Sequence, residues 1–117
     1  MKLKNTTISE DLEHWIETYL KHIQALSYSN NTFLLYRRIL LEFVEYSLDY
    51  QDEMQINDIK TTFLVNFLNY LENDSKNGNK LSKKTKITYL RALTSFFSFI
   101  SDNNDDLFIF SFDMKKI

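Results

Sequence analysis

The sequence predicts an all-α domain of four helices, and three observations support that prediction. The 117 residues include no proline and one glycine, whereas all-β domains need many turn residues. Hydrophobic residues make up 44% of the chain, which is enough for one modest core. Four stretches, near residues 9–26, 30–48, 61–73 and 82–102, repeat apolar side chains at the spacing of a helix face.

The first helix is expected to follow a flexible arm at residues 1–8. Ser9 is suited to cap it, because a serine oxygen can accept a free backbone N–H of the first turn. The apolar stripe of this helix is narrow and ends at Leu26. His14 and His22 lie off the stripe and are farther apart than zinc-binding pairs, so both are interpreted as surface residues and no metal site is predicted.

The second helix follows a turn, in which Ser29 or Asn31 is suited to cap it. Apolar side chains cover more than one side of this helix, so it should contact several neighbours. Arg38 points away from them and has two interpretations. It can grip phosphates together with Arg37, or it can pair with Glu42 one turn later, and the sequence slightly favours the pair.

The third helix lies between a polar connection at residues 48–57 and a flexible loop at residues 72–80. Gly78 can take a positive φ in that loop. The apolar sides of the four helices should meet in one core. The residues expected to be buried together are Trp15, Tyr36, Phe43, Phe67, Leu93 and Phe96.

The fourth helix has two contrasting faces, and Ser82 is suited to cap it. Leu93 and Phe96 mark the face that belongs in the core. Surface helices usually mix both charge signs, but the opposite face here has no acid, so it suits a phosphate-lined groove. An ordinary solvated face without glutamate is the alternative. The residues of this face are Lys84, Thr88, Arg91, Ser95 and Ser98.

Charge is unevenly distributed along the chain. The formal net charge is −2, yet residues 76–101 contain six bases and no acid. A local positive field can therefore coexist with a mildly acidic whole. An isolated domain of this kind should nevertheless hold nucleic acid loosely and release it as the salt concentration rises.

Several classes of function have no support in the sequence. There is no cysteine, no glycine-rich phosphate loop and no supported Ser/His/acid trio, so neither a catalytic residue nor a cofactor is predicted. No apolar run is long enough to span a membrane, and the N-terminus lacks the apolar core of a signal peptide. The expected setting is the cytoplasm, with no membrane partner.

The last segment, LFIFSFDMKKI at residues 107–117, is apolar and aromatic without helical spacing. Such a segment at a chain end either folds back on the core or begins a linker to something else.

Two stretches of the chain follow a known pattern of helices. SNNTFLLYRRILLEFVEY, at residues 29–46, fits the pattern S-x-x-T-x-x-x-Y-x-x-x-L-x-x-F. LSKKTKITYLRALTSFFSFI, at residues 81–100, fits the pattern L-S-x-x-T-x-x-x-x-L-x-A-L-x-x-F-F-x-F. In this order and spacing they resemble the N-terminal, core-binding domain of the tyrosine recombinases, the phage-integrase family. The resemblance covers nearly all of residues 9–103.

The resemblance implies a four-helix, SAM-like bundle of crossed helix pairs over residues 9–103. In the family this domain forms half of a clamp on double-stranded DNA for integration and recombination, and a separate domain carries the catalytic residues. The resemblance therefore implies that residues 104–117 begin a linker to an absent catalytic domain, and that this fragment is not an enzyme although its parent is a tyrosine recombinase. Its implied partners are DNA, its own catalytic domain and other recombinase protomers.

The family uses its second and fourth helices against DNA. The DNA-binding residues that the resemblance implies by motif position are Thr32, Arg38, Lys84, Thr85, Thr88 and Arg91. Thr85 could instead belong only to the helix start, and Ile87 and Tyr89 stand where relatives commonly have bases. A freestanding helical module, which binds a protein through its aromatic tail and wide apolar second helix, is the alternative function.

Overall fold

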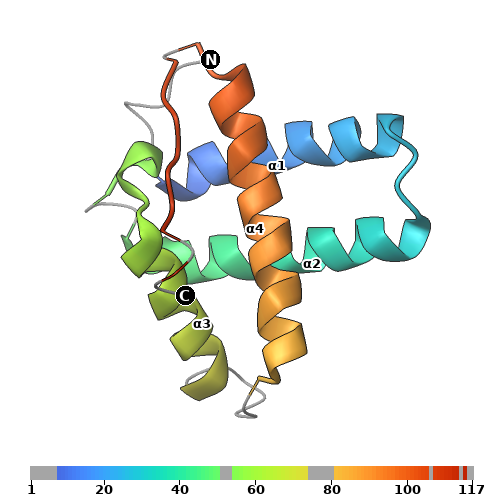
Figure 1. The fold of residues 1–117 in the computed structure, drawn as a ribbon. Coiled ribbons are helices and arrows are strands. Elements are labelled where there is room, and N and C mark those ends of the chain that lie inside the picture. The colour runs from blue at the N-terminus through green and yellow to red at the C-terminus, as the bar shows by residue number, and fades with distance from the viewer. Residues whose placement is uncertain (1–7, 51–53, 74–80, 106, 114, 116–117) are drawn as a thin grey trace.

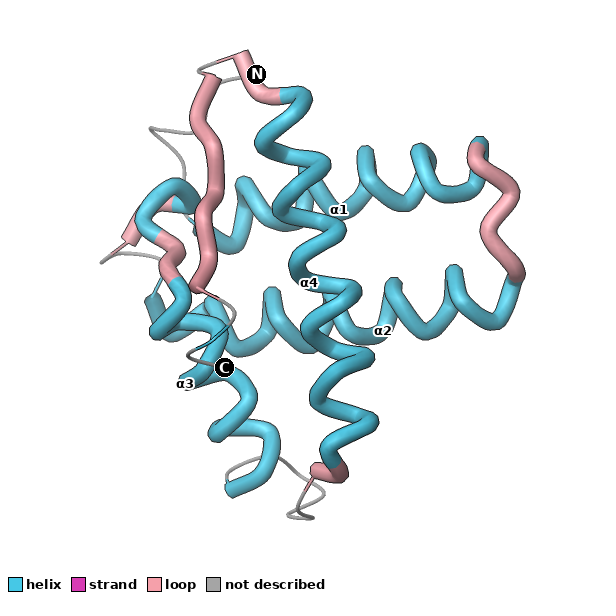
Figure 2. Tube along the Cα trace, viewed as in Figure 1, coloured by secondary structure: helices cyan, strands magenta, loops and turns pink. Residues whose placement is uncertain are grey.

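The computed structural model describes residues 8–50, 54–73, 81–105, 107–113 and 115, and in these it contains helices and no strand (Figures 1 and 2). The long helices are α1 (Ile8–Ala25), α2 (Asn30–Ser47), α3 (Thr61–Asn73) and α4 (Lys83–Asn103). Two short 3-10 helices, η1 (Leu48–Tyr50) and η2 (Ile56–Asp58), lie between α2 and α3. The predicted all-α, four-helix fold is confirmed, and every predicted helix end lies within one residue of the observed one.

The helices form two crossed pairs. α1 and α2 run side by side in opposite directions, and α4 crosses both of them (Figure 1). α3 runs down one side of the molecule, and α4 returns beside it. Because α4 meets α1 and α2 near their middles, one of its faces is covered by two helices while the opposite face is left to solvent.

Matching serine caps begin α2 and α4. The Ser29 Oγ accepts the backbone N–H of Thr32 at 3.2 Å and donates to Thr32 Oγ1 at 2.9 Å. Ser82 makes the same two hydrogen bonds with Thr85, at 3.1 and 2.9 Å. Each serine satisfies one of the four free N–H groups at a helix start. The predicted cap at Ser82 is confirmed, and Ser29, rather than its alternative Asn31, caps α2.

A Schellman turn ends α1. The N–H of Tyr28 donates to the carbonyl of Ile23 at 3.2 Å, and the N–H of Ser27 donates to the carbonyl of Gln24 at 3.0 Å. Ser27 has a φ of 63°, the left-handed conformation that this motif requires after a helix. The turn sends the chain directly back into α2.

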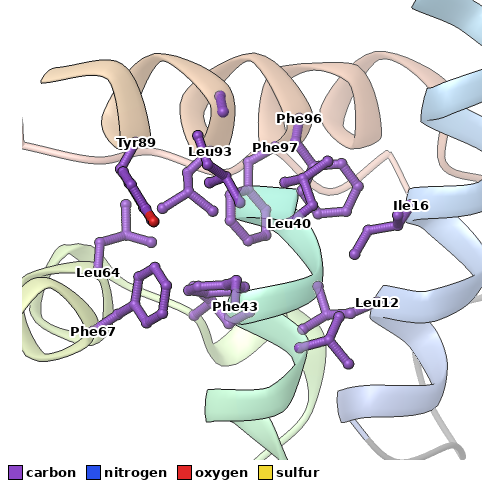
Figure 3. Close-up of a cluster of buried hydrophobic side chains, with 14 of the residues drawn as sticks. Leu12, Ile16, Leu40, Phe43, Leu64, Phe67, Tyr89, Leu93, Phe96 and Phe97 are labelled. Atoms are coloured by element: carbon purple, nitrogen blue, oxygen red, sulfur yellow. The ribbon is translucent and has the colours of Figure 1, made fainter. Parts of the chain in front are cut away.

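The core is aromatic at its centre. Phe43 of α2 lies with its ring centroid 5.0 Å from Phe67 of α3 and 5.8 Å from Phe97 of α4, in edge-to-face geometry. Such pairs add about 0.5–1.5 kcal/mol beyond the area they bury. Phe43 is therefore where three helices meet. The core residues labelled in Figure 3 come from all four helices: Leu12, Ile16, Leu40, Phe43, Leu64, Phe67, Tyr89, Leu93, Phe96 and Phe97.

Three details of the predicted helices were wrong. α1 begins at Ile8, so Ser9 lies inside the helix and does not cap it. Leu26 is 58% exposed, because α1 ends before it and the Schellman turn directs it outward. Tyr36, in the first half of α2, is only partly buried, and its ring lies 6.3 Å from that of the exposed Tyr28 in the preceding turn. The other five residues expected in the core are buried.

The connection between α2 and α3 is more apolar than predicted. Ile56 and Ile59 are buried in the core, because η2 folds the connection back against α1. Of the arm expected at residues 1–8, Ile8 belongs to α1 and residues 1–7 lie outside the described residues. Of the loop expected at residues 72–80, the first two residues belong to α3, and residues 74–80 with Gly78 lie outside the described residues.

Residues 107–113 fold back on the core as an extended segment. The Phe110 ring lies 4.8 Å from Phe97, and the buried Asn104 side chain donates to the Phe108 carbonyl and accepts its N–H. The Phe110 N–H donates to Ser101 Oγ at 2.9 Å. The backbone of this segment is therefore hydrogen-bonded by two side chains, Ser101 in α4 and Asn104 directly after it, instead of by a neighbouring strand.

Candidate nucleic-acid interface

The polar face of α4 presents cations without acidic partners. Lys84 and Arg91 are exposed, and in the described part of the chain neither forms an ion pair. Thr88 lies between them and is half-buried, and its hydroxyl donates to the Lys84 carbonyl at 3.1 Å. The arrangement leaves two cationic side chains to solvent about two turns apart along one helix face.

Lys86 differs from these residues because it pairs with Glu72 of α3. Glu72 is the more buried partner, with 14% of its side chain exposed. Lys86 therefore ties α3 to α4 and contributes little free charge. Lys76 and Lys80, two further bases of the basic stretch, lie outside the described residues.

Both candidate threonines at the helix starts are held by their caps. The Ser29 hydroxyl gives its proton to Thr32 Oγ1, and the Ser82 hydroxyl does the same for Thr85. Each threonine hydroxyl accepts in that bond, so its own proton remains to donate to another group. Thr85 thus belongs to the helix start and still keeps a free donor.

The first turns of α2 and α4 contain no acidic residue. The N-terminus of a helix has unpaired N–H groups and the positive end of the helix dipole, both of which favour an anion nearby. Lys83 and Lys84 add positive charge to the first turn of α4.

Arg38 is engaged at the crossing of α2 and α4. Its Nη1 lies 3.6 Å from Glu42 Oε1, so the pair proposed from the sequence is present. The Tyr89 hydroxyl of α4 donates to the other carboxylate oxygen at 2.8 Å. Burial, followed by this bond to Glu42, raises the pKa of Tyr89 to about 12, so the phenol remains a donor at neutral pH.

Sequence reasoning missed the link between Tyr89 and Glu42. Tyr89 belongs to the core face of α4, and Glu42 was interpreted only as a partner of Arg38 within α2. No local pattern joins two residues that are 47 positions apart. The tyrosine itself, on an apolar stripe with a polar tip, is the only signal that a partner was needed.

A hollow of about 260 Å³ lies between the end of α1 and the second half of α4. The Tyr19 hydroxyl and Ser95 Oγ are 2.8 Å apart at its wall, and the His22 ring lies 4.8 Å from Phe99. Burial raises the pKa of Tyr19 to about 12. Ser95, which the helix pattern assigned to the free polar face, is therefore used to hold α1 against α4.

The alternative function, a protein-binding module, would use the aromatic tail, but in the structure residues 107–113 turn their rings towards the core. The aromatic rings of Phe108, Phe110 and Phe112 pack against the core, so the exposed apolar side chains there are Leu107 and Ile109.

Metal-binding clusters of histidine, cysteine and carboxylates do not occur among the described residues. None of the described helices is both long and apolar enough to cross a bilayer.

The fold agrees with a match to a protein family. The model described as "Phage integrase, N-terminal SAM-like domain" matches residues 16–104, from the middle of α1 to the residue that follows and caps α4. Comparison with curated proteins and with solved structures gave no significant match. Because the family match covers well over half of the chain, the chain belongs to the tyrosine recombinase, or phage-integrase, family and contains its N-terminal SAM-like domain.

Proposed function

We propose that this domain binds duplex DNA through the start of α2 and the polar face of α4, as the core-binding half of a recombinase clamp. The observation that supports this most directly is the exposure of Lys84 and Arg91 on one helix face, with no ion-pair partner among the described residues. Family membership is consistent with it.

The chemistry of the face fits the DNA backbone. Most protein–DNA hydrogen bonds go to phosphates and sugars, and they come from Arg, Lys, hydroxyl side chains and helix N-termini. The face supplies each kind of donor. Its proposed DNA-contacting residues are Thr32, Arg38, Lys84, Thr85, Thr88 and Arg91.

Binding by this domain alone is expected to be weak. Few cations are free on the face, and the chain has a net charge of −2. Each phosphate contact contributes about one unit to the log–log salt dependence of binding, so only a shallow dependence is expected. Tight binding requires the other half of the clamp, which we propose is the catalytic domain of the parent protein.

The proposed role is to hold the DNA site, with strand cleavage left to that catalytic domain and to other protomers on the same DNA. The cytoplasm is the proposed setting. Incubation of the chain with supercoiled plasmid should leave the topology unchanged, since the described residues form no set that could activate a nucleophile at a phosphodiester. Reproducible relaxation by the pure protein would refute this division of labour.

The binding face is tested by titrating ¹⁵N-labelled protein with a mixed-sequence duplex. The amide signals of Lys84, Thr88, Arg91 and Arg38 should shift first. Signals from the polar side of α1, around His14 and Glu17, should not move. Shifts centred on Phe108–Phe112 would contradict the proposed face and support a protein-binding module.

A further inference from the structure

One cation of the proposed face already has a partner inside the protein. The Arg38 guanidinium lies 3.6 Å from Glu42 Oε1, and 60% of the Arg38 side chain is exposed. The Glu42 side chain is 30% exposed. An ion pair that is this long and this open to water exchanges partners readily. A phosphate that approached Arg38 would therefore compete with this carboxylate for the guanidinium.

The carboxylate is held in place from the other helix. Tyr89 is only 5% exposed, and its hydroxyl donates to Glu42 Oε2 at 2.8 Å. The phenol keeps its proton at neutral pH, because burial and the bond to Glu42 raise the pKa of Tyr89 to about 12. One carboxylate oxygen is thus fixed by α4 while the other faces Arg38, so Glu42 cannot swing away without losing a hydrogen bond.

A second ion pair provides a matched comparison. Glu17 and Lys21 of α1 lie 3.7 Å apart with the same four-residue spacing, and both side chains are about three-quarters exposed. Glu17 lies on the side of α1 that is not expected to meet DNA. Neutralising Glu17 changes the net charge by the same amount as neutralising Glu42, so it separates a local effect from a global one.

We propose that Glu42, anchored by Tyr89, competes with DNA phosphate for Arg38 and thereby lowers the affinity of this face for duplex DNA of arbitrary sequence. The inference rests on the proposed function and deepens it. While Arg38 is paired with Glu42, fewer cations attract the DNA phosphates. A larger share of the binding energy must then come from contacts specific to the DNA site.

The test measures the binding of a mixed-sequence 20-base-pair duplex by fluorescence anisotropy over a series of salt concentrations. Glu42→Gln keeps the size of the side chain and an oxygen that can accept from Tyr89, so the fold should be retained. This variant should bind several-fold more tightly than wild type at about 0.1 M salt, with a log–log slope steeper by about one unit. Glu17→Gln should match wild type.

Two further variants test whether the gain in DNA affinity depends on Arg38 and on the bond from Tyr89. In Arg38→Ala/Glu42→Gln the gain should disappear, because the released cation is missing. Tyr89→Phe keeps the charge of Glu42 but removes its anchor, so its affinity should lie between those of wild type and Glu42→Gln. An unchanged Tyr89→Phe variant would overturn the anchoring role.

The outcomes separate this inference from the proposed function. If wild type binds with salt dependence but Glu42→Gln binds no more tightly, or if the gain survives without Arg38, competition is refuted and the DNA face stands. If neither wild type nor Glu42→Gln binds the duplex with salt dependence, the proposed function itself fails.

Discussion

The two faces of α4 show how one helix serves two purposes. Leu93 and Phe96 are fully buried among the other helices, whereas Lys84 and Arg91 on the opposite face contact solvent. Substitutions on the buried face alter packing, and those on the polar face alter charge. The stability of the domain and its attraction for phosphate can therefore vary almost independently.

Two hydrogen bonds of α4 make the separation between packing and surface charge incomplete. Tyr89 of α4 donates a hydrogen bond to Glu42 of α2, and Ser95 of α4 is hydrogen-bonded to Tyr19 of α1. Each is a single hydrogen bond between a tyrosine hydroxyl and a side chain of another helix. The first bond has a charged acceptor beside Arg38, while the second joins two neutral hydroxyls. Only the first can link packing to the charge of the polar face.

The largest expected effect is on the buried face. Leu93→Ala should lower the free energy of unfolding by about 2–5 kcal/mol, because it removes buried methyl groups and leaves a cavity. Urea unfolding measures this loss, and Ser98→Ala on the exposed face should stay within about 0.5 kcal/mol of wild type. A loss in Leu93→Ala no larger than in Ser98→Ala would contradict the assignment of the two faces.

The next effect is on the polar face. Lys84→Ala/Arg91→Ala should weaken duplex binding and flatten the log–log salt dependence by about two units, while the urea midpoint stays constant. The control is Lys21→Ala/Lys115→Ala, which removes the same charge elsewhere. Equal slopes in wild type and Lys84→Ala/Arg91→Ala would show that the face is misplaced.

A smaller effect, on the stability at alkaline pH, is expected from the buried Tyr19. Burial raises the pKa of Tyr19 to about 12 in the folded state, above the unfolded value of about 10. The unfolded state therefore releases this proton first, so stability is fully present below about pH 10 and is lost as pH rises towards about 12.

Urea unfolding of Tyr19→Phe between about pH 9 and 12 tests this expectation. The variant should lose stability less steeply than wild type, by up to about 1.4 kcal/mol per pH unit. Identical pH profiles in the two proteins would rule out a contribution from Tyr19.

The smallest effect is expected far from both faces. Ser27 has a φ of 63°, which is unfavourable for a residue with a Cβ, so Ser27→Gly should stabilise the domain by about 0.5–1 kcal/mol. Thermal unfolding measures the gain, and Ser27→Ala should show none. The salt dependence of DNA binding should not change in either variant, and a change would mean that this turn belongs to the binding surface.

Local features of the fold were predictable from the sequence, because short segments determine them. Helical spacing predicted the four helices. Ser82, and Ser29 with Asn31 as its alternative, were identified as caps because a side-chain oxygen just before a helix can accept a free backbone N–H. Leu26 and Ile56 were misjudged, since their burial depends on where turns send the chain. Periodicity contains no information about such turns.

In the candidate site, too, local features were predictable from the sequence and contacts between distant helices were not. The exposure of Lys84 and Arg91 follows from their place on the helix, and the pairing of Arg38 follows from the four-residue spacing to Glu42. The bond from Tyr89 to Glu42 depends on how two distant helices cross. No helical pattern in one sequence specifies that crossing.

The crossing of α4 over α1 and α2 also affects how the chain is synthesised. The bond between Tyr19 and Ser95 joins residues 76 positions apart, so the core is completed only when the last long helix has left the ribosome. At roughly 5–20 residues per second, the pair α1–α2 waits on the order of several seconds for α4. During that interval Phe43 lacks its ring contact with Phe97 of α4, and apolar surface that is exposed transiently in this way is prone to aggregation.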